Sequence, residues 1–166
     1  MTFAPALNTS ARMPKSSLVK VGPYELQLPE FWGSGSVREK PGFFGYNAVA
    51  VEGVSFALNV LSGLGSDAAE RARLVEALVN GYAPQRHTTE KSSFQGTVFE
   101  SHRLDETEAL GAGSVYELHL CEAYGDLLQL GFGFIKPLPQ EQSLRHLFLT
   151  MVTGAIVRRG YAMHAR

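Results

Sequence analysis

The stretch "VYELHLCEAYGDLLQLGFGFI" (residues 115–135) decides the fold. It contains two alternating runs, 115–123 and 127–135, separated by Tyr124-Gly125-Asp126. An alternation with a period of two is typical of strands, and a short turn that contains glycine joins two such strands antiparallel. The stretch therefore predicts a long β-hairpin.

The second strand of this hairpin has two unlike faces. Its large apolar side chains share one face, and Gly131 and Gly133 lie on the other. The large residues are Leu128, Leu130, Phe132 and Phe134. A face without side chains either admits another element or leaves a shallow surface.

Three earlier segments also have strand patterns. Residues 18–28 predict one or two short strands, residues 43–61 predict a hairpin that turns at Glu52-Gly53, and residues 94–104 predict a further strand. Residues 33–42 are rich in Gly, Ser and Pro and are expected to form a loop.

Two segments have helical periodicity. The first begins with Asp67 and Glu70 in a capping-box spacing and ends before Pro84. The second, residues 140–159, carries a sustained apolar stripe, and Gly160 is expected just beyond its end. Because hairpin turns outnumber long crossovers, we expect an α+β fold: a twisted, mainly antiparallel sheet flanked by helices.

Composition predicts a soluble protein with one α+β domain at residues 18–166, preceded by an N-terminal arm at 1–17. A net charge of −1 argues against nucleic acid as a partner, and no apolar run is long enough for membrane insertion. The single cysteine predicts a reducing compartment, and hence the cytoplasm. The arm has no acidic residue, so organelle targeting is the second expectation.

The segment Gly63-x-Gly65-x-x-Ala68 resembles a dinucleotide-binding fingerprint. Such a site needs a parallel βαβ unit, whereas the preceding strand belongs to a predicted hairpin. Asp67 also places negative charge where a phosphate would sit. We therefore expect these glycines to turn the chain only.

Glu117, His119 and Cys121 alternate along one strand and so share a face. With His102, these three residues are candidate metal ligands. Alternatively, Cys121 could be the reactive thiol of a catalytic centre. Successive side chains on one face lie about 7 Å apart, which resists a Cys–His catalytic contact. We expect this face to be the wetter one, with residues 116, 118 and 120 facing the core. No catalytic residue, metal or cofactor is predicted.

Aromatic residues beside loops commonly pack in the core, and the alternative is that they line a partner-binding groove. The candidate lining is Phe43, Phe44, Phe132 and Phe134. We expect such a groove to receive an apolar segment of a protein partner, because the chain has high aromatic content without clustered catalytic residues.

The segment "YELQLPEFW" (residues 24–32), a strand that leads to Pro29 and Trp32, resembles the opening of the PsbP-like superfamily. The order of elements over residues 18–159 is also similar. That superfamily includes photosystem PsbP, Ran-binding Mog, DcrB-like proteins and chaperones of type VI secretion effectors. The resemblance implies an α+β fold and a binding or assembly role. The acidic segment of the Ran-binding branch is absent, and no functional residue carries over.

We therefore predict a non-catalytic binding protein, an adaptor or chaperone. The sequence is also compatible with a homodimer. The alternatives are a small metal- or thiol-dependent enzyme built on His119, Cys121, Glu117 and His102, and a structural subunit of an organelle complex.

Overall fold

The structure, a computed structural model, describes residues 17–29, 35–49 and 53–164. The strands are β1 Ser17–Val21, β2 Tyr24–Leu28, β3 Ser36–Lys40, β4 Phe43–Val49, β5 Ser55–Leu61, β6 Pro84–Phe94, β7 Thr97–Thr107, β8 Ser114–Ala123 and β9 Asp126–Ile135. The helices are α2 Ala68–Tyr82 and α3 Glu141–His164. The expected arm, residues 1–17, lies outside the described residues except for Ser17.

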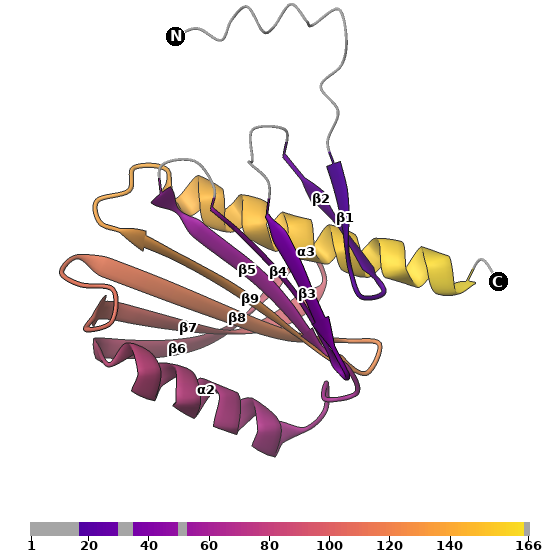
Figure 1. Cartoon of the computed structure of the whole chain (residues 1–166), viewed down its shortest axis with the longest axis horizontal. Helices are drawn as coiled ribbons and strands as arrows, with labels where there is room; N and C mark the ends of the chain where they lie inside the picture. The colour runs from indigo at the N-terminus through magenta and orange to yellow at the C-terminus, as the bar shows by residue number, and fades with distance from the viewer. Residues whose placement is uncertain (1–16, 30–34, 50–52, 165–166) are drawn as a thin grey trace, which may run out of the picture.

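Seven strands form one sheet in the order β3-β4-β5-β9-β8-β7-β6, and β1 and β2 form a separate hairpin. Every pairing is antiparallel. The helix α3 lies across one face of the sheet, and α2 lies on the opposite face (Figure 1). The predicted α+β fold with an antiparallel sheet flanked by helices is confirmed.

The hairpin predicted at residues 115–135 is formed by β8 and β9, with Cys121 opposite Leu128 and Ala123 opposite Asp126. The two turn residues, Tyr124 and Gly125, have φ of 49° and 82°. Two positive φ values are the requirement of a type I′ turn, which fixes the register of the strands.

Two sequence expectations were wrong. The expected loop 33–42 contains β3, an exposed edge strand that pairs with β4. The strand expected at 94–104 is divided between β6 and β7 by a turn at Gln95 and Gly96 (φ 49° and 83°). Both β3 and β6 lie at sheet edges and are largely exposed, so neither carries the alternating burial that marks a strand in a sequence.

The end predicted for the last helix was also wrong, since α3 continues to His164 and includes Gly160. Gly160 is buried, and a Cβ there would overlap the hydroxyl of Tyr124 in the β8–β9 turn. This close approach explains a glycine inside the helix. Arg158 of this helix donates to the carbonyl of Glu25 at 2.7 Å.

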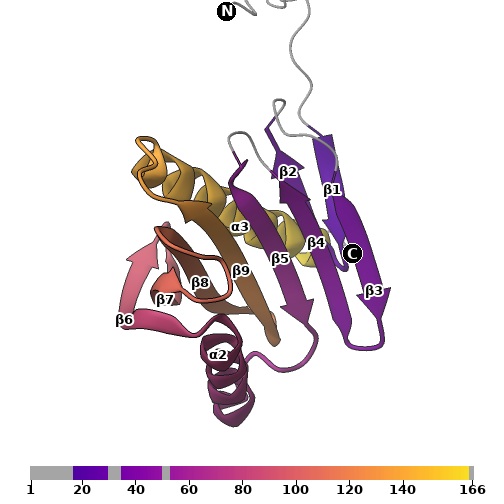
Figure 2. The same ribbon diagram turned by 60° about the vertical axis from the view of Figure 1, so that its left-hand side comes forward.

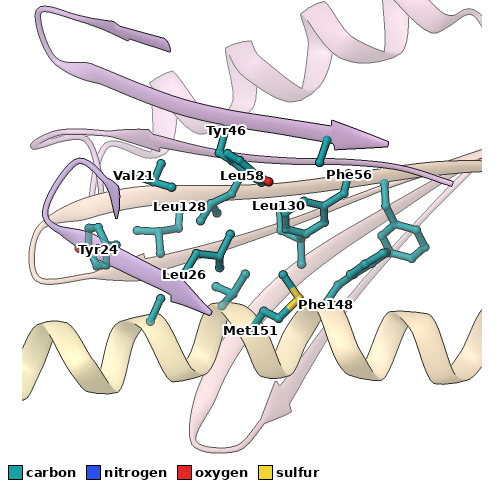
Figure 3. Close-up of a cluster of buried hydrophobic side chains, with 14 of the residues drawn as sticks. Val21, Tyr24, Leu26, Tyr46, Phe56, Leu58, Leu128, Leu130, Phe148 and Met151 are labelled. Atoms are coloured by element: carbon teal, nitrogen blue, oxygen red, sulfur yellow. The ribbon is translucent and has the colours of Figure 1, made fainter. Parts of the chain in front are cut away.

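The main core lies between the sheet and α3 (Figure 3). The apolar faces of β5 and β9 meet Phe148 and Met151 of α3. The β1–β2 hairpin closes one end, where the hydroxyl of Tyr24 donates to the carbonyl of Ala123 at 2.9 Å and contacts Asp126 Oδ2 at 2.8 Å.

A second, smaller core lies between α2 and the other face of the sheet. Leu118, Leu120 and Leu127 are buried there. The half-buried residues that pack on them are Leu61, Leu64, Leu74, Val75, Leu78 and Tyr116. Both faces of β8 and β9 are therefore covered, while β3, β4 and β5 extend beyond α2 (Figure 2).

The glycine loop before α2 turns the chain, as expected. The N–H groups of Gly63 and Gly65 donate to Asp126 Oδ1 and to the carbonyl of Gly125. Asp67 caps α2 by accepting from the N–H of Glu70 at 2.9 Å. The chain itself therefore supplies acceptors for these N–H groups of the loop and of the helix N-terminus.

Candidate functional site

Glu117, His119 and Cys121 share one face of β8, as predicted, but the expectation that this face is the wetter one was wrong. All three are buried against the main core on the α3 side. The residues expected in the core, 116, 118 and 120, face α2 instead, where Leu118 and Leu120 are buried as well. Because α3 covers the polar face, these groups need partners inside the protein.

Glu117 is the centre of a buried ionic cluster. The guanidinium of Arg145 on α3 donates to both of its carboxylate oxygens, at 2.8 and 2.5 Å, and Arg103 on β7 donates at 2.9 Å. Glu141, one helical turn before Arg145, accepts from both arginines at 2.7 and 2.5 Å. The cluster ties the start of α3 to two strands.

The surroundings of Glu117 keep it ionised. Burial raises its pKa, but hydrogen bonds from His119 and Arg145, together with the charge of Arg145, outweigh burial and lower the pKa from 4.5 to about 2. A buried carboxylate with this many donors is stable only in the charged form.

Ser101, His119 and Glu117 form a hydrogen-bonded chain. The Nε2 atom of His119 is 3.0 Å from Glu117 Oε1, and its Nδ1 atom is 2.7 Å from Ser101 Oγ. The ionised carboxylate can only accept, so Nε2 carries a proton and Nδ1 accepts the serine hydroxyl. The three side chains line a cleft of about 340 Å³ between β6, β7, β8 and α3.

Cys121 is not arranged for thiol chemistry. It is 4% exposed, and burial raises its pKa from 9.0 to about 12. The thiol is therefore protonated at neutral pH and is a weak nucleophile. It packs in the main core beside Leu128.

The candidate metal ligands do not converge. Since β7 side chains alternate, Arg103 faces α3 and His102 faces the other side of the sheet. There His102 contacts His87 of β6 at 2.9 Å between Nδ1 and Nε2. Among the residues that the structure describes, no group of three or more His, Cys, Asp and Glu could hold a metal ion.

The four phenylalanines do not form one groove. Phe132 and Phe134 are buried in the main core, where their rings stack 6.0 Å apart. Phe43 and Phe44 are half-buried and, as neighbours on β4, point to opposite faces of the sheet. That part of the prediction was wrong because α3 closes the face that carries Phe132 and Phe134.

A groove does exist on the opposite face, beside the C-terminal end of α2. It encloses about 650 Å³. The side chains and backbone that line it come from Gly35, Ser36, Asn47, Ala48, Ser55, Phe56, Ala57, Tyr82, Tyr116 and Gly131. The glycine face of β9 is evident in the sequence, whereas no sequence pattern marks the two tyrosines beside it.

One wall of this groove is an aromatic pair. The rings of Tyr82 on α2 and Tyr116 on β8 stack with centroids 4.5 Å apart and an angle of 20° between their planes. Burial raises the pKa of both hydroxyls, so both stay neutral. Asn47, Ser36, Ala57 and Gly131 also line the groove.

The fold is PsbP-like, as comparison with solved structures shows. The solution structure of cyanobacterial PsbP (CyanoP) from Synechocystis sp. PCC 6803 is similar over 86% of this chain and 92% of that chain, with a TM-score of 0.55 and 11% identity. A protein of unknown function, PA94 from Pseudomonas aeruginosa, gives a TM-score of 0.40 at 15% identity, over 80% of this chain and 92% of that one.

The sequence matches no protein-family model, and no curated protein is similar enough to match it. Within the described residues, neither helix is long and apolar enough to cross a membrane.

Proposed function

We propose that the protein is a non-catalytic binding protein, an adaptor or chaperone, that holds an apolar segment of a protein partner in the groove beside Tyr82 and Tyr116. The proposal depends on one observation, namely that α2 covers only part of its face of the sheet. The helix α2 packs on Leu118, Leu120 and Leu127, and its last residue, Tyr82, forms a wall of the space that remains.

The chemistry of the groove suits a peptide segment. A volume of about 650 Å³ lies in the range of roughly 300–1,000 Å³ that is usual for binding pockets. The tyrosine rings offer apolar surface at low entropic cost. Asn47, Ser36 and Ser55 offer hydrogen bonds to the polar backbone of the same segment.

The floor of the groove favours close approach. Ala57 and Gly131 are opposite each other on β5 and β9, and the ring of Tyr116 lies over Gly131, so the uncovered part of the sheet surface is at Ala57. The small side chain of Ala57 lets a bulky side chain of a partner approach the sheet beside the Tyr116 ring. The PsbP-like fold and the small net charge of −1 agree with a protein partner rather than a nucleic acid.

A matched pair of variants tests this proposal in a pull-down from native extract. Ala57→Arg fills the groove, while Ala77→Arg makes the same chemical change on an exposed position of α2. The proposal expects one partner to be retained by the wild type and by Ala77→Arg and lost by Ala57→Arg. Equal retention by both variants, with both folded by circular dichroism, would contradict it.

The chain Ser101–His119–Glu117 supports a second candidate function, acyl transfer from an activated ester. His119 Nδ1 is placed to take the proton of Ser101 as its oxygen attacks the ester carbonyl carbon, and to return that proton to the alcohol that leaves when the ester C–O bond breaks. However, Arg145 and Arg103 compete for the charge of Glu117, which reduces its support for a protonated His119. Labelling by a fluorophosphonate that Ser101→Ala abolishes would establish this candidate, and an unlabelled protein would remove it.

A further inference from the structure

We propose that His87 and His102 bind one divalent ion of a late first-row transition metal such as Zn²⁺, on the α2-side face at the β6 edge of the sheet. The two histidines come from neighbouring antiparallel strands, in which Thr89 pairs with His102 and His87 lies two residues before Thr89. This register places Nε2 of His87 2.9 Å from Nδ1 of His102. The inference is independent of the groove.

Glu100 prepares His102 to act as a metal ligand. Its Oε2 atom is 2.7 Å from His102 Nε2. A carboxylate accepts that N–H and so leaves Nδ1 of His102 unprotonated, with its lone pair toward His87. A carboxylate behind a ligating imidazole is the usual outer partner in protein metal sites, where it fixes the tautomer and raises the basicity of the ligand.

The two nitrogens must move apart and turn to bind one ion. Two imidazole nitrogens about 2.0–2.1 Å from one tetrahedral zinc lie roughly 3.3 Å apart. The 2.9 Å between the nitrogens and the 5.2 Å between the ring centroids show that the rings face each other nitrogen to nitrogen, whereas in a zinc site both nitrogens must point at the ion. His102 is 5% exposed and stays in place, so His87, which is exposed on an edge strand, must swing its Nε2 to one side. In doing so, His87 moves its proton from Nε2 to Nδ1 and replaces the hydrogen bond with a metal bond.

Solvent supplies the remaining ligands, and the Thr89 hydroxyl can hydrogen-bond to that solvent. Thr89 Oγ1 lies 3.3 Å from His102 Nδ1 and 3.5 Å from His87 Nε2, beside the place for the ion. Bound metal would join the exposed strand β6 to β7 through side chains.

Zinc titration of untagged, metal-stripped protein by calorimetry tests this site. The proposal expects one Zn²⁺ per chain and no heat with Mg²⁺, which prefers oxygen ligands. His87→Ala should weaken Zn²⁺ binding at least tenfold, and Glu100→Gln by about 10–100-fold. The control is His146→Ala, an exposed histidine on α3, which should bind as the wild type does.

Two results would overturn the proposal: no Zn²⁺ binding by the wild type, or His87→Ala binding Zn²⁺ as tightly as the wild type. An equal loss in His146→Ala would do the same, because it would show binding to scattered surface histidines. His87 is exposed, so its replacement is not expected to unfold the protein, and circular dichroism checks this.

Discussion

The ring of Tyr116 lies over the backbone of Gly131, so closely that a Cβ on Gly131 would overlap the tyrosine hydroxyl. Gly133 contributes to the same arrangement, because a Cβ there would come within 3.3 Å of the ring. The bare face of β9 that the sequence predicted therefore accommodates an aromatic side chain of the neighbouring strand. With Tyr82 stacked upon it, Tyr116 forms the wall of the proposed partner groove.

Replacing Gly131 should therefore disturb both stability and the groove. We expect Gly131→Ala to lower the free energy of unfolding by about 1–3 kcal/mol, because Tyr116 must leave its position in a packed layer. Urea denaturation measures this change.

Gly81→Ala is the control for this substitution. A Cβ on Gly81, near the end of α2, meets nothing within 4 Å. We expect Gly81→Ala to raise the free energy of unfolding by about 0.5–1 kcal/mol, since alanine favours the helix. A Gly131→Ala protein as stable as the wild type would show that Tyr116 is free to move.

Glu117→Gln should be strongly destabilising. The substitution leaves Arg145 and Arg103 without their shared buried carboxylate, and breaking such a pair costs about 3–5 kcal/mol. Glu70→Gln, which removes an exposed pair with Arg73 on α2, should cost less than about 1 kcal/mol. Similar costs for the two variants would contradict the role of the buried cluster.

Stability should also fall in acid because of Glu117. Its pKa is 4.5 when unperturbed and about 2 in the folded protein, so the folded state binds its proton less tightly. The stabilisation is present above pH 4.5 and is lost as the pH falls from 4.5 through about 2. We expect the urea midpoint of the wild type to fall more steeply over this range than that of Glu117→Gln. Parallel curves would contradict this.

Cys121 should resist alkylation in the native protein. With a pKa of about 12 and 4% exposure, it offers almost no thiolate at pH 8. We expect iodoacetamide to label Cys121 in urea but not in buffer, as measured by mass spectrometry. Rapid labelling of the folded protein would restore the thiol-dependent alternative.

Most of the fold could be predicted because the buried residues of its central strands and of α3 form clear apolar patterns in the sequence. Leu128 and Leu130 alternate with small or polar residues, and Phe148 and Met151 recur at helical spacing. The edge strands β3 and β6 could not be predicted in this way. Their residues are exposed on both faces, and they are strands because β4 and β7 offer backbone partners.

The candidate site was predictable only in part. Alternation correctly placed Glu117 and His119 on one face of β8. It could not show that α3 covers this face, because the covering residue, Arg145, lies 28 positions further along the chain. The stacking of Tyr82 on Tyr116 is hidden for the same reason, since it depends on where α2 lies on the sheet.

Photo-crosslinking from inside the groove tests the proposed function most directly. A benzophenone amino acid in place of Ser55, an exposed groove residue, is compared in cells with one in place of Ala77 on the outer surface of α2. The account predicts that one partner crosslinks from position 55 and not from 77, through an apolar segment, and that Ala57→Arg abolishes this crosslink. The same crosslinks from both positions, or a crosslink from position 55 that survives Ala57→Arg, would contradict it.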